Sequence, residues 1–194
     1  HKKGINRLGN ILIPNKSYGI ILEKKIKPVI EKIGEEIAGY ELIWRLGEKA
    51  KKESILYWAN KNKIPVIVPG YYDGAVGSII YQAERKKKLK VNLIEDEKLM
   101  EEKVLTSKKT GALMIGGGIS KHHTIWWNQY KGGLDRIVYL TSAPEWDGSL
   151  SGARVREMVS WGKAKEKSKH VTVEGDATIN LPLMVTALLD RLSG

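Results

Sequence analysis

The stretch Ala112-Leu113-Met114-Ile115-Gly116-Gly117-Gly118 carries the clearest structural signal in this sequence of 194 residues. A short apolar run that ends at glycine is typical of a strand buried on both faces of a parallel sheet. Consecutive glycines let backbone amides approach a ligand closely, and a helix that follows points its positive end to the same place. The stretch matches neither the dinucleotide fingerprint nor the Walker pattern. By itself it would suit an ordinary tight turn equally well.

Similar apolar runs alternate with helical patterns along the chain. We expect strands at residues 64–69, 91–94, 112–115, 137–140 and 170–173, and helices at residues 74–88, 97–108, 122–130, 151–161 and 181–192. This alternation predicts an α/β fold, a Rossmann-like three-layer sandwich with a mostly parallel sheet. The first third reads as a preceding helical segment, over residues 20–37 and 41–60. No repeat or linker divides the chain, so we expect residues 1–194 to form a single α/β domain.

Composition excludes several classes of protein. The chain has no cysteine, which rules out disulfides and thiolate chemistry. No apolar run approaches the ~18 residues of a membrane span, and no secretion signal is recognisable, so we expect a cytoplasmic protein. The net charge of +11 first suggests a nucleic-acid partner. However, the basic runs at 85–88 and 163–169 contain no aromatic residue and no recognition motif, and we interpret them as solvated surface.

Acidic side chains gather after the predicted strands. Asp73, Asp147 and Asp176 each follow one strand, and Glu157 lies in the helix expected at 151–161. Ligands of open α/β sheets bind beyond the carboxyl ends of the strands. Four carboxylates would hold an anionic ligand poorly and a polyamine cation well. The sequence therefore predicts a site for a cationic ligand at this edge.

Two histidines, His122 and His123, follow the glycine run. Adjacent residues of a helix diverge by ~100°, so these two cannot both address one point, and we expect no metal site here. One of them could act as a hydrogen-bond partner or as a general acid or base near neutral pH. The alternative is a histidine that bonds to the backbone at the start of a helix.

The segment Trp161-Gly162-Lys163 follows the helix that carries Glu157. Trp161 could stack on an alkyl-ammonium chain and exclude water. A lysine partly removed from water loses its proton more easily and becomes a nucleophile for imine chemistry. A core tryptophan with a solvated lysine after a helix-ending glycine is the common alternative.

Three motifs together resemble the deoxyhypusine synthase family in order and spacing. They are Gly116-Gly117-Gly118-x-x-Lys121-His122-His123, Glu145-Trp146-Asp147-Gly148-Ser149-x-Ser151-Gly152-Ala153-Arg154 and Glu157-x-x-Ser160-Trp161-Gly162-Lys163. The segments at 4–15 and 57–66 also match, so the resemblance covers nearly the whole chain. Family members are longer, and their amino-terminal part contacts NAD and the polyamine. The resemblance therefore implies that this chain, which begins at His1 without methionine, is the carboxy-terminal part of a longer synthase.

The resemblance also implies roles for individual residues. Lys163 matches the lysine that forms the enzyme–aminobutyl imine, and His122 matches a histidine that lines the spermidine site. Further polyamine-binding positions are Asp73, Gly117, Gly148, Ser149, Glu157 and Trp161. Positions implied to bind NAD are Asp73, Gly116, Gly117, Ser142, Ala143, Asp147, Ser151, Asp176 and Ala177.

The implied reaction is an NAD-dependent transfer of the aminobutyl group of spermidine. The group passes through Lys163 to a lysine of the translation factor 5A precursor, without a metal, in a homotetramer whose sites lie between paired subunits. Trp126 stands where eukaryotic members have asparagine, and Leu150 where they have aspartate, a pattern similar to archaeal members. Three alternatives stay open from the sequence: a homospermidine synthase, a non-catalytic partner subunit and a nucleic-acid-binding module.

Overall fold

The computed structural model describes residues 3–34, 36–86 and 88–194. The chain forms two compact units, residues 1–98 and 99–194. The expectation that the whole chain makes a single domain stays a prediction.

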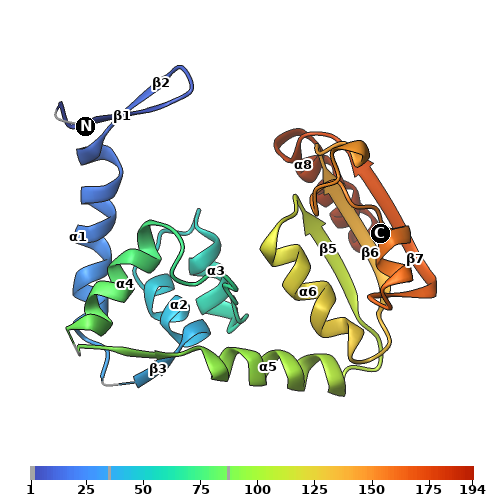
Figure 1. Ribbon diagram of the computed structural model, residues 1–194, viewed down its shortest axis with the longest axis horizontal. Helices are drawn as coiled ribbons and strands as arrows, with labels where there is room; N and C mark the ends of the chain where they lie inside the picture. The colour runs from blue at the N-terminus through green and yellow to red at the C-terminus, as the bar shows by residue number, and fades with distance from the viewer. Residues whose placement is uncertain (1–2, 35, 87) are drawn as a thin grey trace. The chain divides into compact units, whose positions relative to one another are not determined.

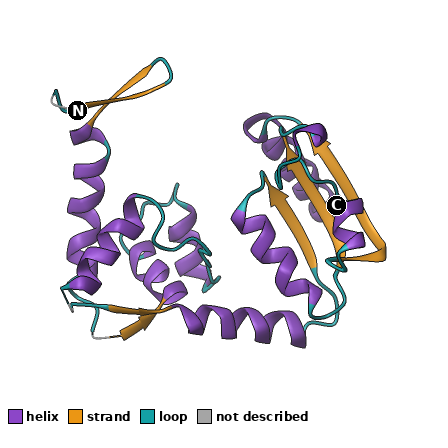
Figure 2. Ribbon diagram, viewed as in Figure 1, coloured by secondary structure: helices purple, strands orange, loops and turns teal. Residues whose placement is uncertain are grey.

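The first unit is mainly helical, and its short strands form two separate pairs (Figures 1 and 2). It begins with an antiparallel hairpin of β1 (Ile5–Leu8) and β2 (Ile11–Pro14), followed by a 3-10 turn, η1 (Asn15–Ser17). Strand β3 (Glu36–Ala38) pairs in parallel with β4 (Lys90–Asn92). The helices are α1 (Gly19–Ile30), α2 (Gly39–Gly47), α3 (Ile55–Asn62) and α4 (Ala75–Arg85), and α5 (Leu93–Thr106) continues into the second unit.

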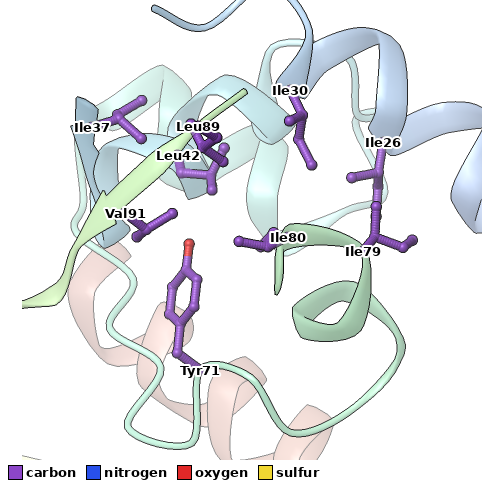
Figure 3. Packing of buried hydrophobic residues seen from close by; sticks show 9 residues of the cluster. All are labelled: Ile26, Ile30, Ile37, Leu42, Tyr71, Ile79, Ile80, Leu89 and Val91. Atoms are coloured by element: carbon purple, nitrogen blue, oxygen red, sulfur yellow. The ribbon is translucent and has the colours of Figure 1, made fainter. Parts of the chain in front are cut away.

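The core of the first unit joins helices α1, α2 and α4 to the β3–β4 pair. Figure 3 shows its nine residues, which are Ile26, Ile30, Ile37, Leu42, Tyr71, Ile79, Ile80, Leu89 and Val91. Beside this core, the buried carboxylate of Asp96 accepts a hydrogen bond from the backbone N–H of Tyr40 at 2.9 Å, in the first turn of α2. A side chain at Gly39 would collide with Asp96, because a Cβ there would lie 2.3 Å from a carboxylate oxygen.

The second unit is a three-layer α/β sandwich. Its sheet has the order β5 (Gly111–Ile115), β6 (Leu134–Thr141) and β7 (Ala164–Glu174), all parallel. Helix α6 (Ile119–Gln129) connects β5 to β6, and α7 (Val155–Ser160) precedes β7 after a 3-10 turn, η2 (Glu145–Asp147). Helix α8 (Ala177–Ser193) follows β7 and lies behind the strands in the view of Figure 1.

The core of the second unit lies between the sheet and the two helices α6 and α7. Ile137 and Tyr139 are two residues apart on β6, so their side chains face the same side of the sheet. They pack in one cluster with Ile125 of α6 and with Val155 and Met158 of α7. This packing fixes α6 and α7 on one face of the sheet.

The predicted fold class is confirmed, and the position of several elements is corrected. Residues 64–68 form no strand in the described structure, because Pro65 and Pro69 lack N–H donors and no neighbouring strand pairs with them. The predicted strand at 91–94 ends at Asn92, and the remaining two residues begin α5. The helix expected at 20–37 ends at Ile30, and the one expected at 41–60 is divided into α2 and α3. Within the described residues, no helix has both the length and the apolar character needed to cross a bilayer.

Candidate active site

Most of the predicted cofactor-binding residues line one cavity at the carboxyl ends of the second unit's strands. The cavity has a volume of about 370 Å³, within the range typical of ligand sites. The predicted residues that line it are Gly116, Gly117, Ser142, Ala143, Ser151, Asp176 and Ala177. Leu140, Thr141 and Gly175 complete the lining. Sequence analysis missed these three, although Thr141 and Gly175 are chain neighbours of predicted residues and Leu140 lies two positions from Ser142.

The glycine turn lines part of the cavity. Gly116 and Gly118 adopt positive φ angles of 72° and 81°, which side-chain-bearing residues rarely adopt. Gly117 has no room for a side chain, since an added Cβ would lie 2.5 Å from the Cα and Oγ atoms of Ser151. The turn therefore packs directly against the loop at 142–154.

Asp176 and Asp147 each accept a hydrogen bond from a backbone N–H two residues further along the chain. The Asp176 side chain accepts a hydrogen bond from the N–H of Thr178 at 2.8 Å and so caps α8. Asp147 accepts one from the N–H of Ser149 at 2.7 Å. Hydrogen bonds from the side chain and the backbone of Ser149 lower the pKa of Asp147, so this exposed carboxylate stays ionised. Gly148, between Asp147 and Ser149, has a φ of 69°.

Lys163 lies between two indole rings. Its Nζ atom is 5.5 Å from the ring centroid of Trp126 and 5.6 Å from that of Trp161. The lysine is half-buried, and both tryptophans are partly open to solvent. Within this range of an aromatic face, an alkyl-ammonium group is attracted by the ring quadrupole. The arrangement suits a cationic or alkyl-amine ligand.

His122 is linked to this group through Trp126. The two side chains are four residues apart on α6, and their ring centroids lie 5.6 Å apart. Sequence analysis noted Trp126 only as a departure from the family pattern. The spacing of four residues from His122 was the available signal, because residues i and i+4 share one face of a helix.

The structure corrects one interpretation of Lys163. Sequence analysis expected the cationic-ligand site at the carboxyl ends of the strands, and the resemblance implied that Lys163 belongs to that site. In the structure, Ala164 pairs with Leu134, the first residue of the parallel strand β6, and the N–H of Leu134 donates to the carbonyl of Lys163 at 3.1 Å. The backbone of Lys163 therefore lies at the amino ends of the strands, whereas the glycine turn lies at their carboxyl ends.

The remaining predicted residues are not among those that line this cavity. Glu157 is exposed on α7, and its carboxylate acts electrostatically on the ammonium of Lys121. Asp73 is exposed in a turn of the first unit, where its N–H donates to the carbonyl of Gly70 at 3.0 Å. The first unit also holds a larger cavity of about 780 Å³, which no predicted site residue lines. Across the described ranges, no three His, Asp or Glu side chains gather as metal ligands would.

The sequence was compared with known families and proteins. The family model "Deoxyhypusine synthase" matches residues 1–188. The "probable deoxyhypusine synthase" of Picrophilus torridus is 51% identical over 191 residues, which are 96% of this chain and 61% of the relative. That of Ignicoccus hospitalis is 48% identical over 198 residues, covering 98% of this chain and 62% of the relative. The chain thus spans about three fifths of the length of these relatives.

A solved structure supports the fold. The crystal structure described as a "putative deoxyhypusine synthase" from Entamoeba histolytica superposes with a TM-score of 0.60 at 23% identity. The superposition covers 89% of this chain and 54% of the other. From the family match and the identity to its archaeal relatives, this chain belongs to the deoxyhypusine synthase family.

Proposed function

We propose that the protein transfers the aminobutyl group of spermidine, with NAD as cofactor, to a lysine of the translation factor 5A precursor. The observation that carries the proposal is the position of Lys163 between the indoles of Trp126 and Trp161, in a chain of this family. The two rings can hold the alkyl chain of an amine and limit the access of water to Lys163. Such a lysine is suited to imine chemistry.

The cavity at the strand ends can hold part of a dinucleotide. It is lined by glycines and small side chains, so backbone groups can approach phosphates and ribose closely. Gly116, Gly117, Ser142, Ala143, Ser151, Asp176 and Ala177 would hold the cofactor, with Asp73 and Asp147 proposed as further contacts. When bound, NAD supplies the hydride acceptor for the oxidation of the amine and the hydride donor for the final reduction.

The residues of the chain bind the polyamine and carry the transferred group. Asp147 is an ionised carboxylate, and Glu157 and Asp73 are exposed carboxylates that can pair with ammonium groups. His122, Gly117, Gly148 and Ser149 are proposed to complete the polyamine site. The Nζ atom of Lys163 attacks the imine carbon of oxidised spermidine, and the bond from that carbon to the departing nitrogen breaks, which releases 1,3-diaminopropane. The amine of the acceptor lysine then displaces Lys163 in the same way.

The placement of Lys163 supports an assembly in which two subunits share each site. Strand β6 has eight residues and is therefore roughly 25 Å long. Within one chain, the cavity and the start of β7 lie at its opposite ends. Reduction of the imine requires the two groups to meet, so we propose that the lysine of one subunit faces the cavity of another in a homotetramer. A cytoplasmic location belongs to the same proposal.

Borohydride trapping tests the proposal. The full-length protein is incubated with NAD and labelled spermidine, reduced with borohydride and mapped by peptide mass spectrometry. We expect the label on Lys163, its loss in Lys163→Ala and its retention in the control Lys167→Ala, which changes an exposed lysine of β7. Label on a different lysine would contradict the assignment of Lys163 as the residue that carries the aminobutyl group. Supplying putrescine in place of the acceptor protein separates a homospermidine synthase from a deoxyhypusine synthase.

A further inference from the structure

Lys121 is a buried lysine for which the proposed function has no role. It precedes His122 on α6, and only 4% of its surface is exposed. Its Nζ atom donates to the carbonyl oxygens of Leu150 at 2.9 Å and Ala153 at 2.8 Å. The same atom lies 3.7 Å from the ring centroid of Tyr139. An ammonium group has three N–H donors, and these two carbonyls and the aromatic face account for all three.

These contacts hold a loop that has little structure of its own. Between β6 and α7, residues 142–154 contain only the short 3-10 turn η2. The carbonyl of Ser151, within this loop, accepts hydrogen bonds from the hydroxyl groups of Tyr139 and Thr141, the latter at 3.1 Å. The carbonyls of residues 150, 151 and 153 are therefore all held by side chains from α6 and β6. The ammonium of Lys121 provides the contact from α6.

The loop and the helix that Lys121 joins carry different parts of the proposed site. The loop carries Asp147, Gly148 and Ser149, and the start of α6 carries His122. Catalytic and binding groups lose much of their effect when they move by about 1 Å. The distance between the loop and α6 must therefore stay constant for the site to work.

The charge of Lys121 is sensitive to its surroundings. Burial lowers its pKa to about 8, while the nearby carboxylate of Glu157 raises it and the guanidinium of Arg154 lowers it further. The phenol ring of Tyr139 completes the charged and titratable groups around it. Above this pKa the amine has only two N–H donors and no positive charge for the ring, so its hold on the loop weakens.

We propose that Lys121 is a positioning residue, which holds the loop at 142–154 against α6 and so keeps the polyamine-binding residues at their working distance. This inference rests on the proposed function for its catalytic consequence, and on the contacts of Lys121 alone for its structural part. Lys121 is not proposed as the nucleophile, because only 4% of its surface is exposed and a substrate has little access to its Nζ atom.

The test compares Lys121→Met with the control Lys109→Met, which changes an exposed lysine of the same unit, both in the full-length protein. Methionine keeps an unbranched side chain and removes the charge. Hydrogen–deuterium exchange without ligand is expected to be about tenfold faster in the peptide covering 142–154 for Lys121→Met only. The KM for spermidine is expected to rise about tenfold, with trapping on Lys163 preserved at saturating spermidine.

The pH dependence separates positioning from general stability. The ratio of kcat/KM between wild type and Lys121→Met is expected to fall as the pH rises from 7 to 9.5, because the wild-type ammonium is lost too. A variant that merely unfolds more easily would lose active protein at every pH. Unchanged exchange in the loop overturns the structural part, and unchanged KM or a constant ratio overturns the catalytic part. Absence of spermidine turnover in the wild type would refute the proposed function instead. The exchange measurement would still test whether Lys121 holds the loop at 142–154.

Discussion

Replacing Gly117 with alanine tests whether the glycine turn and the loop form one cavity. The new Cβ would lie 2.5 Å from the Cα and Oγ atoms of Ser151, whereas ordinary contact begins near 3.4 Å, so the two segments must separate by about 0.9 Å. The loop cannot easily retreat, since the carbonyl of Ser151 is held by Tyr139 and Thr141. Overpacking of this kind costs about 1–3 kcal/mol.

The same displacement should weaken dinucleotide binding, because Gly117 and Ser151 both line the cavity. A shift of about 1 Å can lower activity about 100-fold. Urea unfolding measures the stability, and titration calorimetry measures NAD affinity. The control is Gly19→Ala at the start of α1, where nothing lies within 4 Å of an added Cβ. If Gly117→Ala binds NAD as tightly as the wild type and unfolds at the same urea concentration, the cavity is not the cofactor site.

Three further outcomes are expected. Asp96→Ala should lower the free energy of unfolding by about 2 kcal/mol in chemical denaturation, because the N–H of Tyr40 loses a charged acceptor; a change below 0.5 kcal/mol, about the ordinary effect of surface substitutions, would contradict this. Glu157→Gln and Asp73→Asn should each weaken spermidine binding about tenfold by calorimetry, and equal affinities would make these acids structural. Burial holds the pKa of Lys121 near 8, below the unfolded value of 10.5, so the unfolded chain binds more protons than the folded chain between these pH values. The free energy of unfolding of the wild type, relative to that of Lys121→Met, should therefore rise by about 3 kcal/mol from pH 8 to pH 10.5. A constant difference would mean that Lys121 is not buried as a cation.

The sequence signals were strongest where local pattern and long-range packing agree. The run at 112–115 became β5 because it pairs in parallel with β6 and packs Met114 into the core, although Leu113 and Ile115 on its other face stay exposed, contrary to the expectation of a strand buried on both faces. The run at 64–69 has a similar apolar pattern, but its prolines remove N–H donors, and pattern alone does not show whether a neighbouring strand is present to pair with it. The hairpin of β1 and β2 was not predicted, because β1 has Asn6 and Arg7 side by side and so shows neither an apolar run nor a regular alternation.

The same distinction applies to the site. The glycines and strand-end residues could be predicted, because a parallel sheet gathers its carboxyl ends at one edge. The contact of Lys163 with Trp126 depends on how α6 packs beside the start of β7, which no spacing along the chain encodes. Lys121 is part of a motif that resembles the family, but the sequence gives it no role, and its packing against Tyr139 and the loop carbonyls is seen only in the structure.

The separation of Lys163 from the cavity along β6 has a consequence for mixed assemblies. If each site takes its lysine from one subunit and its cavity from another, Lys163→Ala and Gly117→Ala damage different halves of the same site. A pair built from one subunit of each variant then contains one doubly damaged site and one intact site. Two preparations that are inactive alone should therefore regain activity when they are unfolded and reassembled together, up to the share of such mixed pairs. If each site were confined within a single chain, the same mixture would stay inactive.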